Sequence, residues 1–312
     1  MAALILRRLA TAAVLMLGAA VVSFGMLYLA PGSPAEAIIR TQTTRDATAQ
    51  EIASFDERHD LDATLPDLAL QWLRRLGLGD LGDSLRTGEP VLAEFTDRFP
   101  ATLELAAAAM LIAVALAVPL GVLSAYWHGS VLDHVCRVLA LLAICVPGFW
   151  MGLMLILTFC VGLGWLPCFG RGGAAHLALP ALTLGAGIGA VLTRLLRASM
   201  LEVLGANYVR TARAKGLRER AVLVRHALRN ASVPVVTIMG LEVGHLLTGT
   251  VIVETVFGWP GVGQYFVQAI SARDYPVVRG FVLAFALVFV LANLAVDIGC
   301  AYLDPRARHA PG

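Results

Sequence analysis

The chain has 312 residues, of which 58% are hydrophobic and 15% are charged, with a formal net charge of +2. Soluble globular domains carry about 25% charged residues, so this composition argues against an ordinary soluble enzyme or binding module. The balanced charge likewise gives no reason to expect a nucleic-acid partner.

Six long segments with few or no charged residues follow one another along the chain. Each reaches or approaches the roughly 20 residues that cross about 30 Å of hydrocarbon. They cover residues 9–30, 105–127, 138–170, 174–193, 231–253 and 280–296. Helices buried in a soluble core would need polar faces, and these have none. We therefore predict an all-α polytopic membrane protein with six transmembrane helices, kinked at Pro119, Pro147 and Pro180.

The first segment follows Arg7 and Arg8, as the apolar part of a signal peptide would. Its uncharged run covers residues 9–30 and exceeds the usual apolar region of about 7–15 residues, and no A-x-A site closes it before Pro31. We expect it to be retained, so that residues 1–30 form a cytoplasmic N-terminus and transmembrane helix 1.

Residues 31–98 form an acidic segment with 13 acids and seven arginines. Its pattern predicts two amphipathic helices, at about 47–59 and 65–77. Pro90 and Pro100 are expected to break the approach to the second span. The segment is too small for an enzyme domain with its own core, so we expect a small extracytoplasmic helical segment between helices 1 and 2.

Lys and Arg in short loops favour the cytoplasmic side of a membrane. Arginines precede the first span and follow the sixth, and seven of the 24 Lys and Arg residues lie at 210–230. Both termini and that loop are therefore predicted to be cytoplasmic. The helical core then covers residues 99–303, with a cytoplasmic loop at 199–230 and an outer loop at 256–279, followed by a cytoplasmic tail at 304–312.

The stretch RTARAKGLRERAVLVRHALRN (210–230) has a pattern beyond its charge. Tyr208, Thr211-Ala212 and Lys215 recur at three-to-four spacing, which predicts a short helix with a small-residue face. Gly216 supplies the conformation that ends a helix, and a second helix is expected after it. Attraction to membrane lipid, about 1 kcal/mol per basic residue near the surface, explains the charge but requires neither the glycine nor the alanines. These features favour docking into a groove of a partner protein.

The segment ANYVRTARAKGLRERAVLVRHALRNASVPVVT (206–237) resembles the cytoplasmic loop of binding-protein-dependent ABC importer permeases. More narrowly, it is similar to the B-type inner-membrane permeases of the dipeptide/oligopeptide/nickel family. Further matches are LAPGSPAEA (29–37), GDLGDSLRTGEPV (79–91), FPATLELA (99–106), HLALPALTLG (176–185), VIVETVFGWPGVG (251–263), RDYPVV (273–278) and DPR (304–306). The general signature E-A-A-x-x-x-G is matched strictly only at Gly216, since Arg210, Thr211 and Ala212 stand at its first three positions. This departure resembles the peptide/nickel branch.

The resemblance implies a type I ABC importer permease fold with a coupling helix that seats in a cleft of a cytoplasmic ATPase. The residues implied for this contact are Tyr208, Arg210, Thr211, Ala212, Arg213, Ala214, Lys215 and Gly216. The implied partners are a second homologous permease, two cytoplasmic ATPase subunits and an extracytoplasmic solute-binding protein, in the bacterial inner membrane. ATP and Mg²⁺ would be bound by the ATPase subunits, and no cofactor by this chain.

The residues also argue against a nucleotide site of the standard kind. A Walker A motif requires Gly-Lys-[Ser/Thr], and the only lysine, Lys215, lies between Ala214 and Gly216. No G-x-S-x-G or H-E-x-x-H motif occurs either. We therefore expect a permease subunit that is not itself an enzyme, with ATP hydrolysed by another subunit.

Glu242 and His245 lie three residues apart in the fifth span, so they share a helix face. Ionisable groups inside a bilayer are costly and usually face the protein interior or a pathway. Either the pair lines the translocation path and meets a cationic group or a metal complex, or it hydrogen-bonds to a neighbouring helix or to the partner permease. Two residues are too few to predict a metal site.

Trp259, Pro260 and Gly261 break the chain at the outer end of the fifth span, before a short interfacial helix expected near 262–270. The resemblance suggests an outer gate or a surface that faces the solute-binding protein. Aromatic anchoring at the membrane interface is the alternative.

The motifs leave the cargo open, because peptide and nickel permeases share them. We expect di- or oligopeptides, with nickel or a metal chelate as the alternative. A channel or secondary transporter is the alternative function, but it would not need a cytoplasmic helix that docks into a groove.

Overall fold

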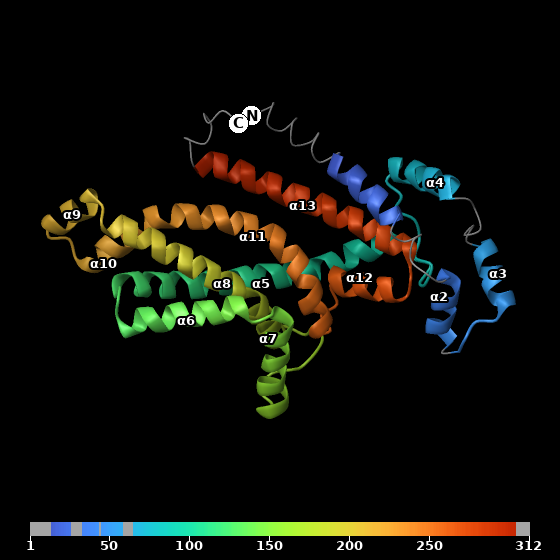
Figure 1. Ribbon diagram of the computed structural model, residues 1–312, viewed down its shortest axis with the longest axis horizontal. Coiled ribbons are helices and arrows are strands. Elements are labelled where there is room, and N and C mark those ends of the chain that lie inside the picture. The colour runs from blue at the N-terminus through green and yellow to red at the C-terminus, as the bar shows by residue number, and fades with distance from the viewer. Residues whose placement is uncertain (1–13, 26–32, 44, 59–64, 304–312) are drawn as a thin grey trace. The chain divides into compact units, whose positions relative to one another are not determined.

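The computed structural model describes residues 14–25, 33–43, 45–58 and 65–303 (Figure 1). Apart from one isolated β-bridge between Asp83 and Pro90, the regular structure of these residues is helical, which confirms the all-α prediction. The chain divides into two compact units. The first comprises the described residues up to Ala101 together with Pro260–Leu294, and the second comprises Thr102–Trp259 together with the residues from Ala295.

Each predicted apolar segment has a helical counterpart among the described residues. Three helices are long and apolar enough to cross a membrane alone: α5 (Val91–Tyr126), α8 (Ala174–Leu204) and α13 (Tyr275–Leu303, apolar over Tyr275–Val296). Two bent helix pairs raise that number to five when each pair counts as one span. A shorter apolar helix covers Val14–Gly25, and the rest of the predicted first span lies outside the described residues.

The span predicted over residues 138–170 is sharply bent in its middle, at the kink expected at Pro147. α6 (Val131–Cys145) and the continuous pair α7 (Gly148–Leu155) and η1 (Ile156–Gly162, a π-helix) meet at 105°. Val146 and Pro147 between them have extended ψ angles of 124° and 133°. Proline lacks an N–H and disfavours the helical conformation of the residue before it. Figure 1 shows α7 leaving the direction of α6 at this point.

The prediction that Pro100 breaks the chain before the second span is wrong. α5 begins at Val91, directly after Pro90, and continues through Pro100. Packing against other helices holds α5 on both sides of the proline: Phe95 lies edge to face with Phe281 of α13 at 5.3 Å before it, and Leu105 is fully buried after it. Tertiary packing thus outweighs the local helix-breaking effect of the proline.

The segment before α5 is helical, as predicted, and adds one helix that was not expected. The helices expected at about 47–59 and 65–77 are α3 (Ala49–Arg58) and α4 (Leu65–Gly77), and α2 (Pro34–Thr43) is the addition. α3 begins with a capping box: the Thr48 N–H donates to Glu51 Oε2 at 2.9 Å, and the Glu51 N–H donates to Thr48 Oγ1 at 3.3 Å. Arg45 also binds this carboxylate, at 2.5 Å from Glu51 Oε1.

In the first unit, a buried carboxylate joins two stretches that are far apart in the sequence. Asp274 is fully buried and accepts hydrogen bonds from the Ser84 hydroxyl at 2.5 Å, the Leu85 N–H at 3.1 Å and the Arg86 N–H at 3.3 Å. We call residues 83–90 the outer turn. Its motif GDLGDSLRTGEPV and the motif RDYPVV therefore meet through one side chain. Nearby, α12 (Val262–Ser271) contributes Tyr265, whose hydroxyl donates to Glu94 at 3.1 Å.

In the second unit, α5 and α8 approach each other closely through small residues. A Cβ atom at Gly185 would lie 2.5 Å from the Ala109 carbonyl oxygen, and one at Gly189 would lie 3.2 Å from the Ala113 Cα. Such small-residue contacts let membrane helices pack backbone to backbone. Farther along α8, the buried residues Leu192, Leu196 and Met200 pack against Ala113, Ala117, Ala227 and Ala231.

Candidate functional site

The basic segment, residues 207–230, folds as the predicted helix, glycine and second helix. It consists of α9 (Asn207–Ala214), α10 (Glu219–Ala221) and η2 (Val222–Leu228), which continues into α11 (Arg229–Val256). Gly216 has a φ of 76°, and the N–H groups of Gly216 and Leu217 donate to the carbonyls of Arg213 and Ala212 at 2.9 and 3.4 Å. This is a Schellman ending, which glycine adopts without steric cost.

One face of α9 packs against its own chain. Val209, Ala212 and Val222 form a buried cluster, against which Val203 and Leu204 of α8 pack. Ala212 is only 7% exposed, so the small residues expected to share one docking face lie on two different faces of α9. Ala212 faces the interior of the unit, whereas Ala214 is exposed. The predicted contact of Ala212 with a partner is therefore corrected to an internal packing role.

The remaining residues predicted for this contact are exposed. They are Tyr208, Arg210, Thr211, Arg213, Ala214, Lys215 and Gly216. Figure 1 shows α9 and α10 together at the end of α8, well away from α7. The structure thus brings seven of the eight predicted residues to one surface segment.

Two polar contacts that were not predicted from the sequence link residues on the exposed face of α9 to neighbouring parts of the basic segment. Arg213 pairs with Glu219 at 2.7 Å across the glycine turn, and this hydrogen bond raises the pKa of the Arg213 guanidinium. The Asn230 side-chain amide donates to the Tyr208 hydroxyl at 2.9 Å. Glu219 could have been found from the sequence, because it is the only acid among residues 210–230.

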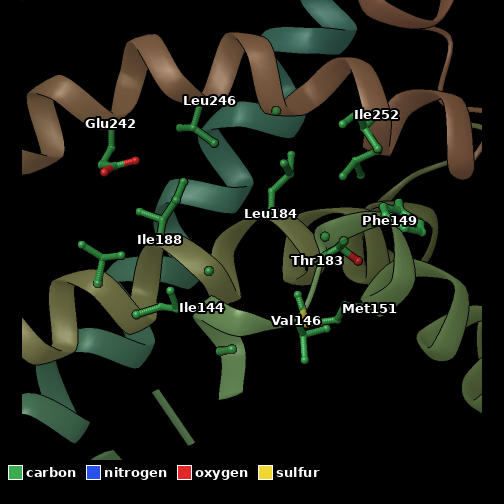
Figure 2. A pocket seen from close by; sticks show the side chains of 16 residues that line it. Ile144, Val146, Phe149, Met151, Thr183, Leu184, Ile188, Glu242, Leu246 and Ile252 are labelled. Carbon is green, nitrogen blue, oxygen red and sulfur yellow. The ribbon is translucent and has the colours of Figure 1, made fainter. Parts of the chain in front are cut away.

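An open pocket of about 400 Å³ lies in the second unit, between the α6–α7 break, α8 and α11 (Figure 2). Figure 2 shows Ile144 and Val146 from the break on one side and Leu246 and Ile252 of α11 on another, and Phe149 also lines the pocket. The wall is otherwise apolar, with Thr183 and Glu242 as the polar side chains among the lining residues.

Glu242 therefore lies in a pocket, as the pathway reading of the sequence requires. Figure 2 shows its carboxylate near one end of the pocket, on the same helix as Leu246. His245 belongs to α11, and its side chain lies outside the described residues. Among the residues that the structure describes, no three His, Cys, Asp or Glu side chains gather in a group that could hold a metal ion.

The predicted outer break lies between α11 and α12. Gly258 has a φ of 58°, and the Trp259 N–H donates to the Glu254 carbonyl at 2.9 Å. The Trp259 side chain is fully buried, Pro260 is exposed, and Gly261 is the N-cap of α12. The chain break is thus present at the predicted residues, while their gate role stays a prediction.

The sequence reasoning missed Glu254, which is fully buried one turn before this break. Its carboxylate accepts a hydrogen bond from the Thr102 hydroxyl at 2.7 Å. The signal was present, because Glu254 is an acid within the apolar run VIVETVF. Buried polar groups need such hydrogen-bond partners, because leaving one unpaired costs free energy.

Sequence comparison matches residues 117–309 to the family described as the binding-protein-dependent transport system inner membrane component. The chain is 37% identical over 337 aligned residues to the dipeptide transport system permease protein DppB of Alkalihalophilus pseudofirmus, which covers 99% of this chain and 100% of that one. It is 39% identical to DppB of Escherichia coli (strain K12), with 98% of each chain covered. It is 42% identical to the glutathione transport system permease protein GsiC of Pectobacterium atrosepticum, with 93% of each covered.

Two solved structures share the fold. The MetNI methionine ABC transporter in inward facing conformations has a TM-score of 0.55 at 17% identity, covering 68% of this chain and 97% of that one. An amino acid ABC transporter crystallised with histidines has a TM-score of 0.52 at 16% identity, covering 69% and 94%. These likenesses confirm the permease fold expected from the sequence.

Proposed function

The chain belongs to the family of binding-protein-dependent transport inner membrane components, the permease subunits of ABC importers, and from that premise we propose that its cargo is a peptide. The relatives compared above are named for dipeptide and glutathione transport, and they match nearly the whole chain. The single observation that carries the proposal is this full-length similarity to peptide permeases. Nickel or a metal chelate is the alternative cargo.

The pocket between the α6–α7 break, α8 and α11 is this subunit's part of the translocation path in our proposal. A peptide brings apolar side chains and a positively charged N-terminal ammonium group. The pocket offers an apolar wall and the Glu242 carboxylate. Opposite charges about 4 Å apart attract by about 4 kcal/mol at an effective dielectric constant near 20. Glu242 would therefore guide the ammonium group of the cargo.

The exposed face of the basic segment is the proposed contact with a cytoplasmic ATPase. Its exposed basic and small residues, with the Schellman turn at Gly216, form a short surface helix of fixed shape. The chain offers no Gly-Lys-[Ser/Thr] sequence, so we assign ATP hydrolysis, with its Mg²⁺, to partner subunits. The full proposed assembly has a second homologous permease, two ATPase subunits and a solute-binding protein. In the inner membrane, both termini and the basic segment lie on the cytoplasmic side.

Reconstitution tests the cargo and the energy source together. The complete complex in proteoliposomes, supplied with its binding protein, should take up a labelled dipeptide only when ATP is present. Uptake of a nickel chelate without peptide uptake would overturn the peptide assignment. Peptide flux through this chain without ATP or partners would support the channel or secondary transporter.

The role of Glu242 is tested in the same system. Glu242→Gln should raise KM by about tenfold for peptides with a free amino terminus, the loss of one charge-assisted hydrogen bond. N-acetylated peptides should transport equally well in both proteins. Thr183→Val is the matched control, because it removes another polar group from the pocket wall at constant shape. An equal loss for acetylated peptides would show that Glu242 acts only on structure.

A further inference from the structure

The start of α6 holds a buried carboxylate with an unusually full set of donors. Asp133 is 1% exposed. It accepts from the Ser124 hydroxyl at 2.6 Å and the Gly129 N–H at 3.0 Å, and from Arg197 Nε and Nη2 at 2.7 and 2.8 Å. The Arg197 contact is bidentate, the geometry that fixes orientation as well as distance. One side chain thus ties together the end of α5, the following turn, α6 and α8.

Arg197 lies in the part of α8 that carries the basic segment. Beside it, Leu196 and Met200 are buried against Ala227 and Ala231, where the basic segment returns into α11. Farther along, Val203 and Leu204 pack against the buried face of α9. The last turns of α8 and the basic segment therefore pack as one body.

On the other side of the ion pair, α6 leads directly to the pocket. The buried face of α6 consists of Asp133, Cys136 and Ala140, so apart from the carboxylate it is small and smooth. Small residues let a neighbouring helix approach closely, but they form no directional bond with it. At the C-terminal end of α6, Ile144 and Val146 line the same pocket as Glu242.

We propose that the Asp133–Arg197 pair is the joint that carries movement of the basic segment into α6, and from there to the pocket. Asp133 and Arg197 are positioning residues for coupled transport, since neither lines the pocket or the exposed face of α9. The bidentate pair fixes α8 relative to α6 at one point, whereas Cys136 and Ala140 add contact without a bond of fixed direction. This inference rests on the coupling role proposed for the basic segment.

The competing explanation is a fold brace with no part in coupling. A brace would change how much complex assembles and how stable it is, but each assembled complex would still move the same amount of cargo per ATP. A joint predicts the opposite pattern, in which assembled complexes hydrolyse ATP yet transport less. The ratio of peptide uptake to ATP hydrolysis separates the two.

The experiment compares Asp133→Asn with wild type in proteoliposomes that contain the complete complex and its binding protein. Asp133→Asn should lower peptide uptake per ATP hydrolysed by about tenfold, within the range of measured couplings between two sites. Binding-protein-stimulated hydrolysis should stay near wild type. Arg197→Lys keeps the charge without the bidentate fork, so its ratio should fall between the two.

Arg137 supplies the matched control. It forms a longer ion pair with Asp133 at 3.8 Å, and its side chain is 45% exposed, so Arg137→Gln removes a positive charge beside Asp133 while the bidentate Arg197 contact stays in place. Its uptake per ATP should equal that of wild type. A similar loss in Arg137→Gln would show that net charge at this end of the protein is responsible, and would overturn the proposal.

Asp133→Asn leaves the partly buried Arg197 without its counter-ion and can prevent assembly for that reason alone. The double variant Asp133→Asn/Arg197→Gln removes both charges and should assemble. Uptake per ATP in that variant should still be about tenfold low. A wild-type ratio in the double variant, or its failure to assemble, would show a brace. Absence of ATP-driven uptake in wild type would instead refute the proposed function itself.

Discussion

The outer turn and the basic segment are both short connections between helices, yet they treat their polar groups in opposite ways. The outer turn directs its hydroxyl and amide groups inward to the buried carboxylate of Asp274. The basic segment buries only the apolar face around Val209 and leaves its arginines and Lys215 exposed. The first satisfies these polar groups within the chain, whereas the second leaves its charged groups exposed, as the docking proposed for it requires. The two segments therefore differ in where their polar groups find partners.

The largest expected effect comes from removing the Asp274 carboxylate, which accepts the hydrogen bonds of the outer turn. Asp274→Ala leaves the Ser84 hydroxyl and the amides of Leu85 and Arg86 without this acceptor, each at about 1–3 kcal/mol, so we expect a loss of about 3 kcal/mol or more. The loss should appear as a lower Tm of the purified protein in detergent and as faster proteolysis within residues 83–90. Asp274→Asn, which keeps one acceptor oxygen, should lose less. An unchanged Tm in Asp274→Ala would contradict the conclusion that Asp274 stabilises the outer turn.

The next effect separates the two faces of α9. Ala212→Glu places a charge in the cluster of Val209 and Val222, and we expect it to lower stability by about 2 kcal/mol or more, because buried unpaired charges are among the most destabilising changes. Ala214→Glu adds the same side chain on the exposed face. It should leave Tm unchanged but reduce binding-protein-stimulated ATP hydrolysis in the reconstituted complex. Equal Tm values for the two variants would contradict the assignment of faces.

A smaller effect is expected at the turn that shapes the docking surface. A Cβ at Gly216 would meet no atom within 4 Å, so the strain of a substitution comes from the φ of 76° alone. Gly216→Val should therefore cost about 1–2 kcal/mol locally, and transport and stimulated ATP hydrolysis should fall together. Gly216→Asn is the control, since asparagine tolerates this conformation and should keep most activity. Intact coupling in an assembled Gly216→Val complex would mean that the basic segment is not the coupling element.

The smallest effect concerns the capping box of α3, a solvent-exposed counterpart of the inward-facing outer turn. Hydrogen bonds from Arg45, and then from the Thr48 N–H and hydroxyl, lower the pKa of Glu51 to about 2. Because the folded pKa lies below the ordinary value of 4.5, the stabilisation is present above pH 4.5 and disappears as the pH falls through about 2. Hydrogen exchange at residues 49–58 should accelerate across this window. Arg45→Gln should shift the acceleration to higher pH, and an identical profile would exclude the contact in solution.

Local features of the fold could be predicted from the sequence wherever a few neighbouring residues decide the structure. Gly216 ends α9 because only its own backbone conformation matters there. The membrane segments follow from their length and lack of charge. The break at Pro147 was visible as a proline, but its 105° angle was not, because the direction of a broken helix depends on what α7 packs against.

Features that depend on contacts between residues far apart in the chain could not be predicted from the sequence. Asp133 and Arg197 are 64 residues apart, and Ser84 and Asp274 are 190 residues apart, so no local pattern joins either pair. Ala212 was assigned to the wrong face because alanines occur on both sides of α9. Glu242 could be singled out as a charge in an apolar run, whereas its pocket required the packing of α8 against α11.

The break between α6 and α7 has a consequence for hydration of the main chain inside the bilayer. With 15 residues at about 1.5 Å each, α6 alone is shorter than the hydrocarbon layer of about 30 Å, so a span that begins with α6 would carry the extended peptides at Val146 and Pro147 within that layer. Non-helical backbone is tolerated at that depth only where protein covers it or water wets it. At this bend the Val146 N–H donates to the Leu142 carbonyl and the Pro147 carbonyl accepts from the Met151 N–H, both at 3.0 Å. The third span can thus change direction while these main-chain groups stay hydrogen-bonded within the protein, and they need neither lipid nor water as a partner.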